Sequence, residues 1–367
     1  MRNKYAKTII ALIGSIIIIG IIILASVSTI YSQQKLGTPY HFLTRQVIYL
    51  LIGIFGAYII YKIDLEKIKK YSLFLVLANI ALLAAVFIPG IGWGSGGAKR
   101  WIILGPLQLQ PTELLKLTFI IFAATWLAKA VESLKNKKNF ITNFRHLAMC
   151  CIVFIVIAAI LIKQPDISSF AVLFFIFSIM LFVSGIQLRY FLGIIILGLT
   201  ILISIILRMP HTIKRIETFL NPTDDILGAG LQIHQAAIAI GSGGLFGLGL
   251  GMSKQKMGFL PETLSDTIFA IFAEETGFVG CIVLILLFIA FTWTGFNIAK
   301  KTKDKFSSIA AAGIVSWISI QAFINISAML GIIPLTGIAL PFISYGGSHL
   351  ITELFAIGLL LNITKKS

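Results

Sequence analysis

Ten long apolar segments run through the chain, and they constrain its fold more than any other feature. A helix of about 20 apolar residues crosses the hydrocarbon core of a bilayer. None of the segments shows the alternating pattern of a membrane barrel strand. The sequence therefore predicts an all-α, polytopic integral membrane protein with spans at residues 8–30, 46–63, 71–89, 112–131, 147–163, 167–186, 190–208, 267–296, 307–332 and 348–364.

The composition supports this class and excludes a soluble domain. Of the 367 residues, 58% are hydrophobic and only 12% are charged, whereas about a quarter of the residues in soluble domains are charged. In a soluble protein the formal net charge of +16 would suggest nucleic acid. In a membrane protein it reflects topology, because Lys and Arg gather in cytoplasmic loops, so we expect no nucleic-acid partner.

The distribution of Lys and Arg predicts the orientation. With the N-terminus inside, 19 of the 30 bases fall on the cytoplasmic side and 10 on the outer side, while Lys116 lies within a span. Both termini are therefore predicted to be cytoplasmic. The apolar stretch after Arg2, Lys4 and Lys7 is longer than a signal-peptide core, so we expect an uncleaved first helix.

Three outer segments interrupt the pattern of short connections, and function is expected there. Residues 90–111 contain five glycines before a Lys-Arg-Trp sequence. The outer loop at about 209–266 is too long for a bare connector, and its apolar stretch at 230–240 is too short to span, which predicts an interfacial or re-entrant helix. Residues 333–348 are uncharged and contain two prolines. We treat residues 1–367 as a single transmembrane domain.

Ionisable side chains inside spans are functional candidates, because burying one costs about 2.5–3.5 kcal/mol by insertion scales. Glu113 and Lys116 open the fourth span three residues apart, so they share a helix face and can pair. A purely structural pair is an open alternative, since Glu is favoured in a first helical turn and Lys would neutralise it. Glu274 and Glu275 point in different directions, so at least one should bind a buried base or hydroxyl.

Asp266 lies where the long outer loop enters the eighth span. Because Asp is a preferred N-cap, a capping role and a catalytic role are both open on these residues alone. Asp166, in the short turn between the fifth and sixth spans, is expected to serve a turn or a cap. Four bases of the outer loops would suit a diphosphate, and equally anionic lipid headgroups: Lys99, Arg100, Lys214 and Arg215.

Four segments resemble the signatures of the SEDS family, the polytopic proteins FtsW, RodA and SpoVE. They are GAKRWIILGPLQLQPTELLKL (97–117), RIETFLNPTDDILGAGLQIHQAAIAIGSGGLFGLGLG (215–251), LPETLSDTIFAIFAEETGFVG (260–280) and NISAMLGIIPLTGIALPFISYGGS (325–348). Within the family, GLGLGMSKQKMGFLPE and PLTGIALPFISYGGS favour the FtsW division type over RodA.

The resemblance implies a peptidoglycan glycosyltransferase that polymerises lipid II at the outer face of the bacterial cytoplasmic membrane, for cell division or cell shape. It implies a class B penicillin-binding protein as partner, alongside other divisome or elongasome membrane proteins. The family's catalytic aspartate falls on Asp266. The expected substrate-binding residues are Lys99, Arg100, Glu113, Lys116 and Arg215. The expected supporting residues are Trp101, Gln110, Asp166, Glu262 and Ser344.

The implied reaction is displacement at a sugar C1 by the 4-hydroxyl of another sugar, with undecaprenyl diphosphate leaving. Asp266 is the expected general base, and the outer bases would neutralise the diphosphate. A divalent cation such as Mg²⁺ or Mn²⁺ would also suit the diphosphate, although no sequence feature fixes one. Two alternatives stay open: a flippase for lipid II, and a non-catalytic scaffold for the penicillin-binding protein.

The chain departs from the family pattern at several positions. Thr267 follows the aspartate where an aromatic residue is usual, and Leu264 stands where a histidine is common. His349 and Glu353 are unusual near the last span. Because Asp266 is retained, these departures bear on substrate details and partner contacts more than on activity.

Overall fold

The computed structural model describes residues 2–95, 98–104, 107–135, 140–222 and 228–365. Within them, ten helices are long and apolar enough to cross a membrane, which confirms the predicted class and number of spans. They are α1 (Arg2–Leu36), α2 (His41–Lys62), α3 (Leu65–Ala85), α4 (Pro111–Lys135), α5 (Phe140–Lys163), α6 (Ile167–Ser184), α7 (Leu188–Arg208), α10 (Ile268–Lys301), α11 (Lys305–Met329) and α12 (Gly347–Thr364).

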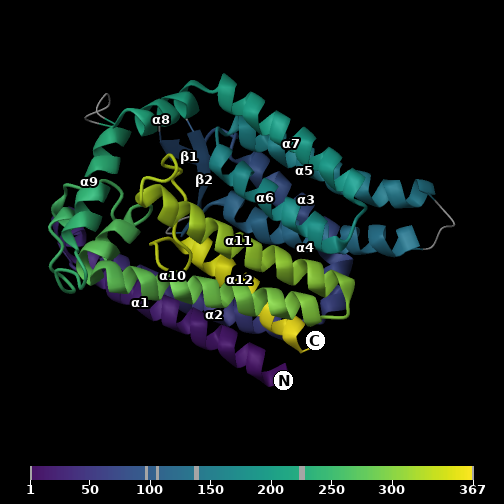
Figure 1. Ribbon diagram of the computed structural model, residues 1–367, viewed down its shortest axis with the longest axis horizontal. Helices are drawn as coiled ribbons and strands as arrows, with labels where there is room; N and C mark the ends of the chain where they lie inside the picture. Colours follow the sequence, from purple (N-terminus) through teal and green to yellow (C-terminus); the bar gives the residue numbers. More distant parts are fainter. Residues whose placement is uncertain (1, 96–97, 105–106, 136–139, 223–227, 366–367) are drawn as a thin grey trace.

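The helices form one bundle whose two ends differ (Figure 1). Both termini lie at one end, as an even number of spans requires, and the elements of the long loop gather at the other. Helices α4, α11 and α12 are mostly buried within the bundle, whereas α7 exposes most of its surface. The first half of α11 contains a run of small buried residues, Ala310 to Gly313, which let neighbouring helices approach closely.

Gly358 lies where α12 packs against the backbone of α2. A Cβ atom at this position would lie 2.4 Å from the carbonyl oxygen of Ala57 and 2.7 Å from its Cα. Since backbone atoms cannot rotate away, a larger residue must push the two helices apart.

We therefore expect Gly358→Val to destabilise the protein by about 1–3 kcal/mol, the usual cost of overpacking. The measurement is the thermal melting midpoint in detergent. The matched control is Gly14→Val in α1, where an added Cβ meets no atom within 4 Å. Equal midpoints for the two variants would contradict the close packing of α2 and α12.

The first outer segment contains a small antiparallel sheet, a departure from the purely helical prediction. Its strands are β1 (Gly92–Ser95), β2 (Ala98–Leu104) and β3 (Leu107–Leu109), in the order β1-β2-β3. Side chains alternate along β2, so buried Ile102 and half-buried Arg100 face the bundle while Lys99 is exposed on the other face. Strands this short and rich in glycine carry little sequence signal.

The long outer loop contains two helices, α8 (Pro210–Leu220) and α9 (Ala229–Ser242), and a 3₁₀ turn, η2 (Gln255–Met257). The apolar stretch at 230–240 lies in α9, so the predicted helix is confirmed. Its depth in the membrane remains a prediction.

Helix α10 is broken at Gly277, whose φ of 68° and ψ of −168° are not helical. The break frees two carbonyl groups, which accept hydrogen bonds from backbone N–H groups in the glycine-rich part of the long loop. The Leu248 N–H donates to the Glu274 carbonyl oxygen (2.9 Å), and the Gly249 N–H to that of Glu275 (3.1 Å). These bonds fix the end of the loop that leads to Asp266.

The carboxylates of Glu274 and Glu275 bind different partners. Glu274 accepts from the Ser253 hydroxyl and from the Lys254 N–H (3.0 Å). Glu275 accepts from Lys256 Nζ (2.9 Å) and from a serine hydroxyl of α1. The prediction that at least one of them binds a buried base or hydroxyl is confirmed.

Candidate active site

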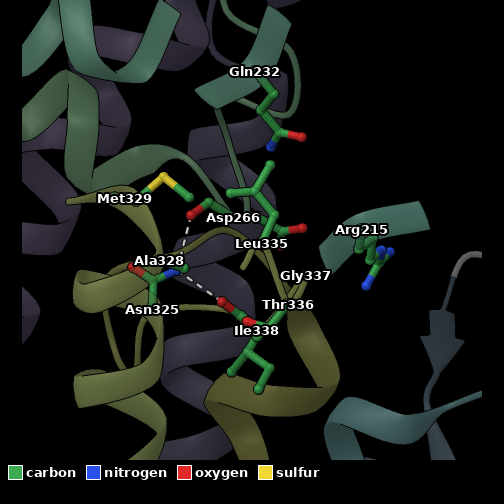
Figure 2. A pocket seen from close by; sticks show the side chains of 10 residues that line it. All are labelled: Arg215, Gln232, Asp266, Asn325, Ala328, Met329, Leu335, Thr336, Gly337 and Ile338. Carbon is green, nitrogen blue, oxygen red and sulfur yellow. Dashed lines mark hydrogen bonds between the residues drawn. The ribbon is translucent and has the colours of Figure 1, made fainter. Parts of the chain in front are cut away.

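Asp266 lies just before α10, and its side chain does not cap the helix. The residue at the N-cap position is Thr267, and no side-chain capping bond forms there. Of the two roles left open for Asp266, capping was therefore wrong. The side chain instead lines a cavity of about 90 Å³, shown in Figure 2, whose lining residues are Arg215, Gln232, Asp266, Asn325, Ala328, Met329, Leu335, Thr336, Gly337 and Ile338.

The backbone around Asp266 is held by side chains from α11 and from the loop that follows α11. Asn325 Nδ2, on α11, donates to the carbonyl oxygens of Asp266 (2.8 Å) and Ile338 (2.7 Å), the dashed lines of Figure 2. The Ser344 hydroxyl donates to the carbonyl oxygen of Ser265 (2.6 Å). The segment that carries Asp266 is thus tied both to α11 and to the loop that follows it.

The pKa of the Asp266 carboxyl group lies above the ordinary value for an aspartate. Burial raises its pKa from 3.8 to about 6, and the negative charge of Glu262 acts in the same direction, whereas Arg215 and a hydrogen bond from Ser265 lower it. Glu262 has a φ of 54°, a left-handed conformation that is rare for a residue other than glycine. A carboxyl group with a pKa near the working pH is suited to general base catalysis.

Arg215 on α8 brings positive charge to the same region. Burial lowers its pKa first, and the neighbouring charge of Arg100 lowers it further, while Asp266 and Asp166 raise it. An arginine nevertheless stays protonated at any physiological pH. The sheet, the α5–α6 turn and the start of α10 therefore place Arg100, Asp166 and Asp266 within electrostatic reach of Arg215.

Asp166 and Arg100 are also fixed by local bonds. Asp166 is the N-cap of α6, where it accepts from the Ser169 N–H (3.3 Å), so its predicted cap role is confirmed. Arg100 donates through Nη2 to the Pro165 carbonyl oxygen. The buried Nε of Arg100 has no hydrogen-bond partner in the described part of the chain.

Glu113 and Lys116 pair inside the protein. Lys116 Nζ lies 2.8 and 2.9 Å from the two carboxylate oxygens of Glu113 and 2.9 Å from Gln321 Oε1, over the ring of Trp317. Both charged side chains are buried, and neither lines the cavity at Asp266. This placement favours the structural pair over the substrate-binding role that the resemblance implies.

The remaining predicted residues on β2 and before α4 do not line the cavity at Asp266. Lys99 is exposed, Trp101 is partly exposed on the same strand, and the Gln110 N–H donates to the Ser348 hydroxyl (3.0 Å) just before α4. Of the predicted residues, Arg215 and Glu262 lie within electrostatic reach of Asp266, and Ser344 bonds to the preceding residue. Arg100 and Asp166 lie within electrostatic reach of Arg215.

Sequence reasoning missed Asn325 and Gln321, both on α11. Both are amide side chains within an apolar span. The criterion used for charged residues in spans would have identified them as candidates, because any polar group in a span needs a partner.

The comparisons with known proteins agree with this architecture. A family model described as "Cell cycle protein", which represents FtsW, RodA and SpoVE, matches residues 6–367. The chain belongs to the FtsW/RodA/SpoVE family. It is 39% identical to stage V sporulation protein E of Bacillus subtilis, covering 95% of this chain and 94% of the relative. It is 37% identical to the probable peptidoglycan glycosyltransferase FtsW of Geobacter metallireducens, covering 99% and 96%.

Two solved structures show the same fold. The rod shape determining protein RodA of Thermus thermophilus matches with a TM-score of 0.70 and 25% identity, covering 97% of this chain and 95% of that one. A chain from a study of the structural coordination of polymerization and crosslinking by a peptidoglycan synthase complex matches with a TM-score of 0.76, also at 25% identity, covering 97% and 96%. The resemblance inferred from the four sequence segments is confirmed.

Proposed function

We propose that the chain is a peptidoglycan glycosyltransferase that polymerises lipid II, with Asp266 as its general base. The observation that carries this proposal is the Asp266 carboxylate, which does not cap α10, has a pKa of about 6 and lines a cavity together with Arg215. Relatives of nearly the same length that are named peptidoglycan glycosyltransferases support the reaction class.

In the proposed reaction, the 4-hydroxyl of one sugar attacks C1 of another. Asp266 accepts the hydroxyl proton, a contribution of about 10²–10⁴ in rate. The bond between C1 and the diphosphate oxygen breaks, and its electron pair leaves with the diphosphate. Arg215 and Arg100 would stabilise the charge that develops on this leaving group.

The donor groups of the described residues do not form a metal site. No group of three or more His, Cys, Asp and Glu side chains in this part of the chain is arranged to hold a metal ion. The Asp166 carboxylate is engaged as the cap of α6, and Glu262 is the carboxylate whose charge acts on Asp266. We therefore derive the positive charge for the diphosphate from Arg215 and Arg100.

The cavity must widen to admit substrate. Its volume of about 90 Å³ is well below the roughly 300–1,000 Å³ of typical ligand pockets. Its walls come from α8, α9, α11 and the loop after α11. We infer that movement of α8 and α9 away from α11 precedes the binding of lipid II.

The orientation and partner follow from the same proposal. The excess of Lys and Arg at one side supports cytoplasmic termini and an active site that faces the periplasm or cell exterior. The likeness to a chain of a peptidoglycan synthase complex supports assembly with a class B penicillin-binding protein, whose crosslinking would follow polymerisation.

The contacts of the acidic residues in the spans favour this chemistry over lipid II transport. Glu274 accepts from Ser253 and Lys254, and Glu275 pairs with Lys256, so both carboxylates have partners within the protein. Lipid II polymerisation by Asp266→Asn separates a scaffold function from catalysis, because only a catalytic role requires this carboxylate.

We expect the pH dependence of kcat/KM to report the ionisation of the Asp266 carboxyl group. Because the base must be deprotonated, kcat/KM should fall about tenfold per unit below pH 6. Arg215→Gln removes a charge that lowers the pKa of Asp266 and should move this acid limb to higher pH. Glu262→Gln removes a charge that raises the pKa and should move it to lower pH. Midpoints that fail to shift in opposite directions would contradict the assignment.

A further inference from the structure

The loop between α11 and α12, residues 330–346, is a long non-helical segment whose second half is buried. Buried backbone groups need hydrogen-bond partners, and within a membrane protein these must come from the protein itself. Side chains of several helices supply them to carbonyl groups of the loop: Ser168 to Thr336 (2.7 Å), Asn325 to Ile338 (2.7 Å), Gln321 to Ala339 (3.1 Å) and Gln46 to Ser344 (3.2 Å).

Glu353 and His349 bind the most constrained part of this loop. They lie one turn apart on α12 and are both buried. Glu353 Oε2 accepts from the Phe342 N–H (2.9 Å), and His349 Nε2 lies 3.1 Å from the Ser344 carbonyl oxygen. Phe342 has a φ of 63°, a left-handed conformation that persists in such a residue only where its surroundings impose it.

The segment held by Glu353 and His349 is the one that contacts the Asp266 region. The Ser344 hydroxyl accepts from the Leu340 N–H (2.8 Å) and donates to the Ser265 carbonyl oxygen, one residue before Asp266. Further up the loop, Gly337 lies against the carboxylate, since a Cβ there would be 3.4 Å from Asp266 Oδ2. The loop is therefore one wall of the cavity in Figure 2.

We propose that Glu353, with His349, is a positioning residue for glycosyl transfer: by holding Phe342 and Ser344 it fixes the loop that sets the place of Asp266. The inference rests on the proposed role of Asp266 as base. Glu353 acts here as a hydrogen-bond acceptor for a backbone N–H.

The test compares two substitutions of Glu353 in lipid II polymerisation with the partner protein. Glu353→Gln keeps an oxygen acceptor, and we expect kcat and KM within about twofold of wild type. Glu353→Met removes the acceptor, and we expect kcat to fall about tenfold or more with KM little changed, because a misplacement of about 1 Å can cost 10²-fold in rate. Thr352→Val is the matched control, since its hydroxyl bonds only within α12.

Normal kcat in Glu353→Met, or equal losses in the Gln and Met variants, would overturn the proposal. If Glu353→Met does not fold, His349→Gln and His349→Leu decide it: the Gln variant should retain kcat and the Leu variant should lose it, and equal rates would overturn the proposal. Asp266→Asn is assayed in parallel. Activity in that variant would refute the base, whereas an inactive Asp266→Asn beside a normal Glu353→Met would refute only the positioning role.

Discussion

Asp266→Asn is expected to abolish polymerisation of lipid II while leaving the protein folded. Asparagine has nearly the shape of aspartate but cannot accept the proton of the attacking hydroxyl. Loss of a general base lowers rates by about 10²–10⁴. Since the Asp266 side chain forms no helix cap, the start of α10 does not depend on its carboxylate.

The same substitution should keep or raise the stability of the protein at neutral pH. The pKa of Asp266 rises from 3.8 to about 6 on folding, so the folded state disfavours the ionised form. This destabilisation is absent below pH 3.8 and fully present above about pH 6. An amide removes it, which is the trade between stability and activity expected at a catalytic residue.

Lys116→Met is expected to be the most destabilising of the substitutions considered. It removes the ammonium group that pairs with Glu113 at 2.8 Å, where both side chains are buried. Leaving one member of a buried ion pair without its partner costs about 3–5 kcal/mol, which is a large part of the total stability of most proteins. We expect a sharp fall in the melting midpoint or in the yield of folded protein.

A double variant separates charge from packing at this pair. Glu113→Gln combined with Lys116→Met removes both charges, so most of the lost stability should return. Lys69→Met is the control, because its partners Glu66 and Asp304 are 65% and 39% exposed and such pairs contribute at most about 1 kcal/mol. If the double variant melts no higher than Lys116→Met, the ion pair is not what Lys116 contributes.

The sequence predicted the spans well because the length of an apolar run directly reports a membrane crossing. Their ends were less predictable. Helix α3 begins at Leu65 rather than at residue 71, since Asp64 caps it and its charged first turns continue the helix beyond the apolar run. Hydropathy marks where a helix enters hydrocarbon, whereas capping decides where it begins.

Local rules also predicted the cap at Asp166 and the pairing of Glu113 with Lys116. Their surroundings could not be predicted in the same way. The bonds of Asn325 to Asp266 and of Ser344 to Ser265 join residues 59 and 79 positions apart, and only the packed bundle brings them together. The placement of Lys99 and Arg100 on opposite faces of β2 could not be predicted either, because the composition of this segment did not indicate a strand.

The most direct test of Asp266 as the general base measures two quantities on one preparation of Asp266→Asn with its partner protein. These are the initial rate of lipid II polymerisation at pH 7 and the melting midpoint, each beside wild type and beside Glu66→Gln, an exposed carboxylate on α3. We predict a rate at least about 100-fold below wild type with an equal or higher midpoint, and wild-type values for Glu66→Gln. Near-normal strand synthesis by folded Asp266→Asn would contradict the proposal.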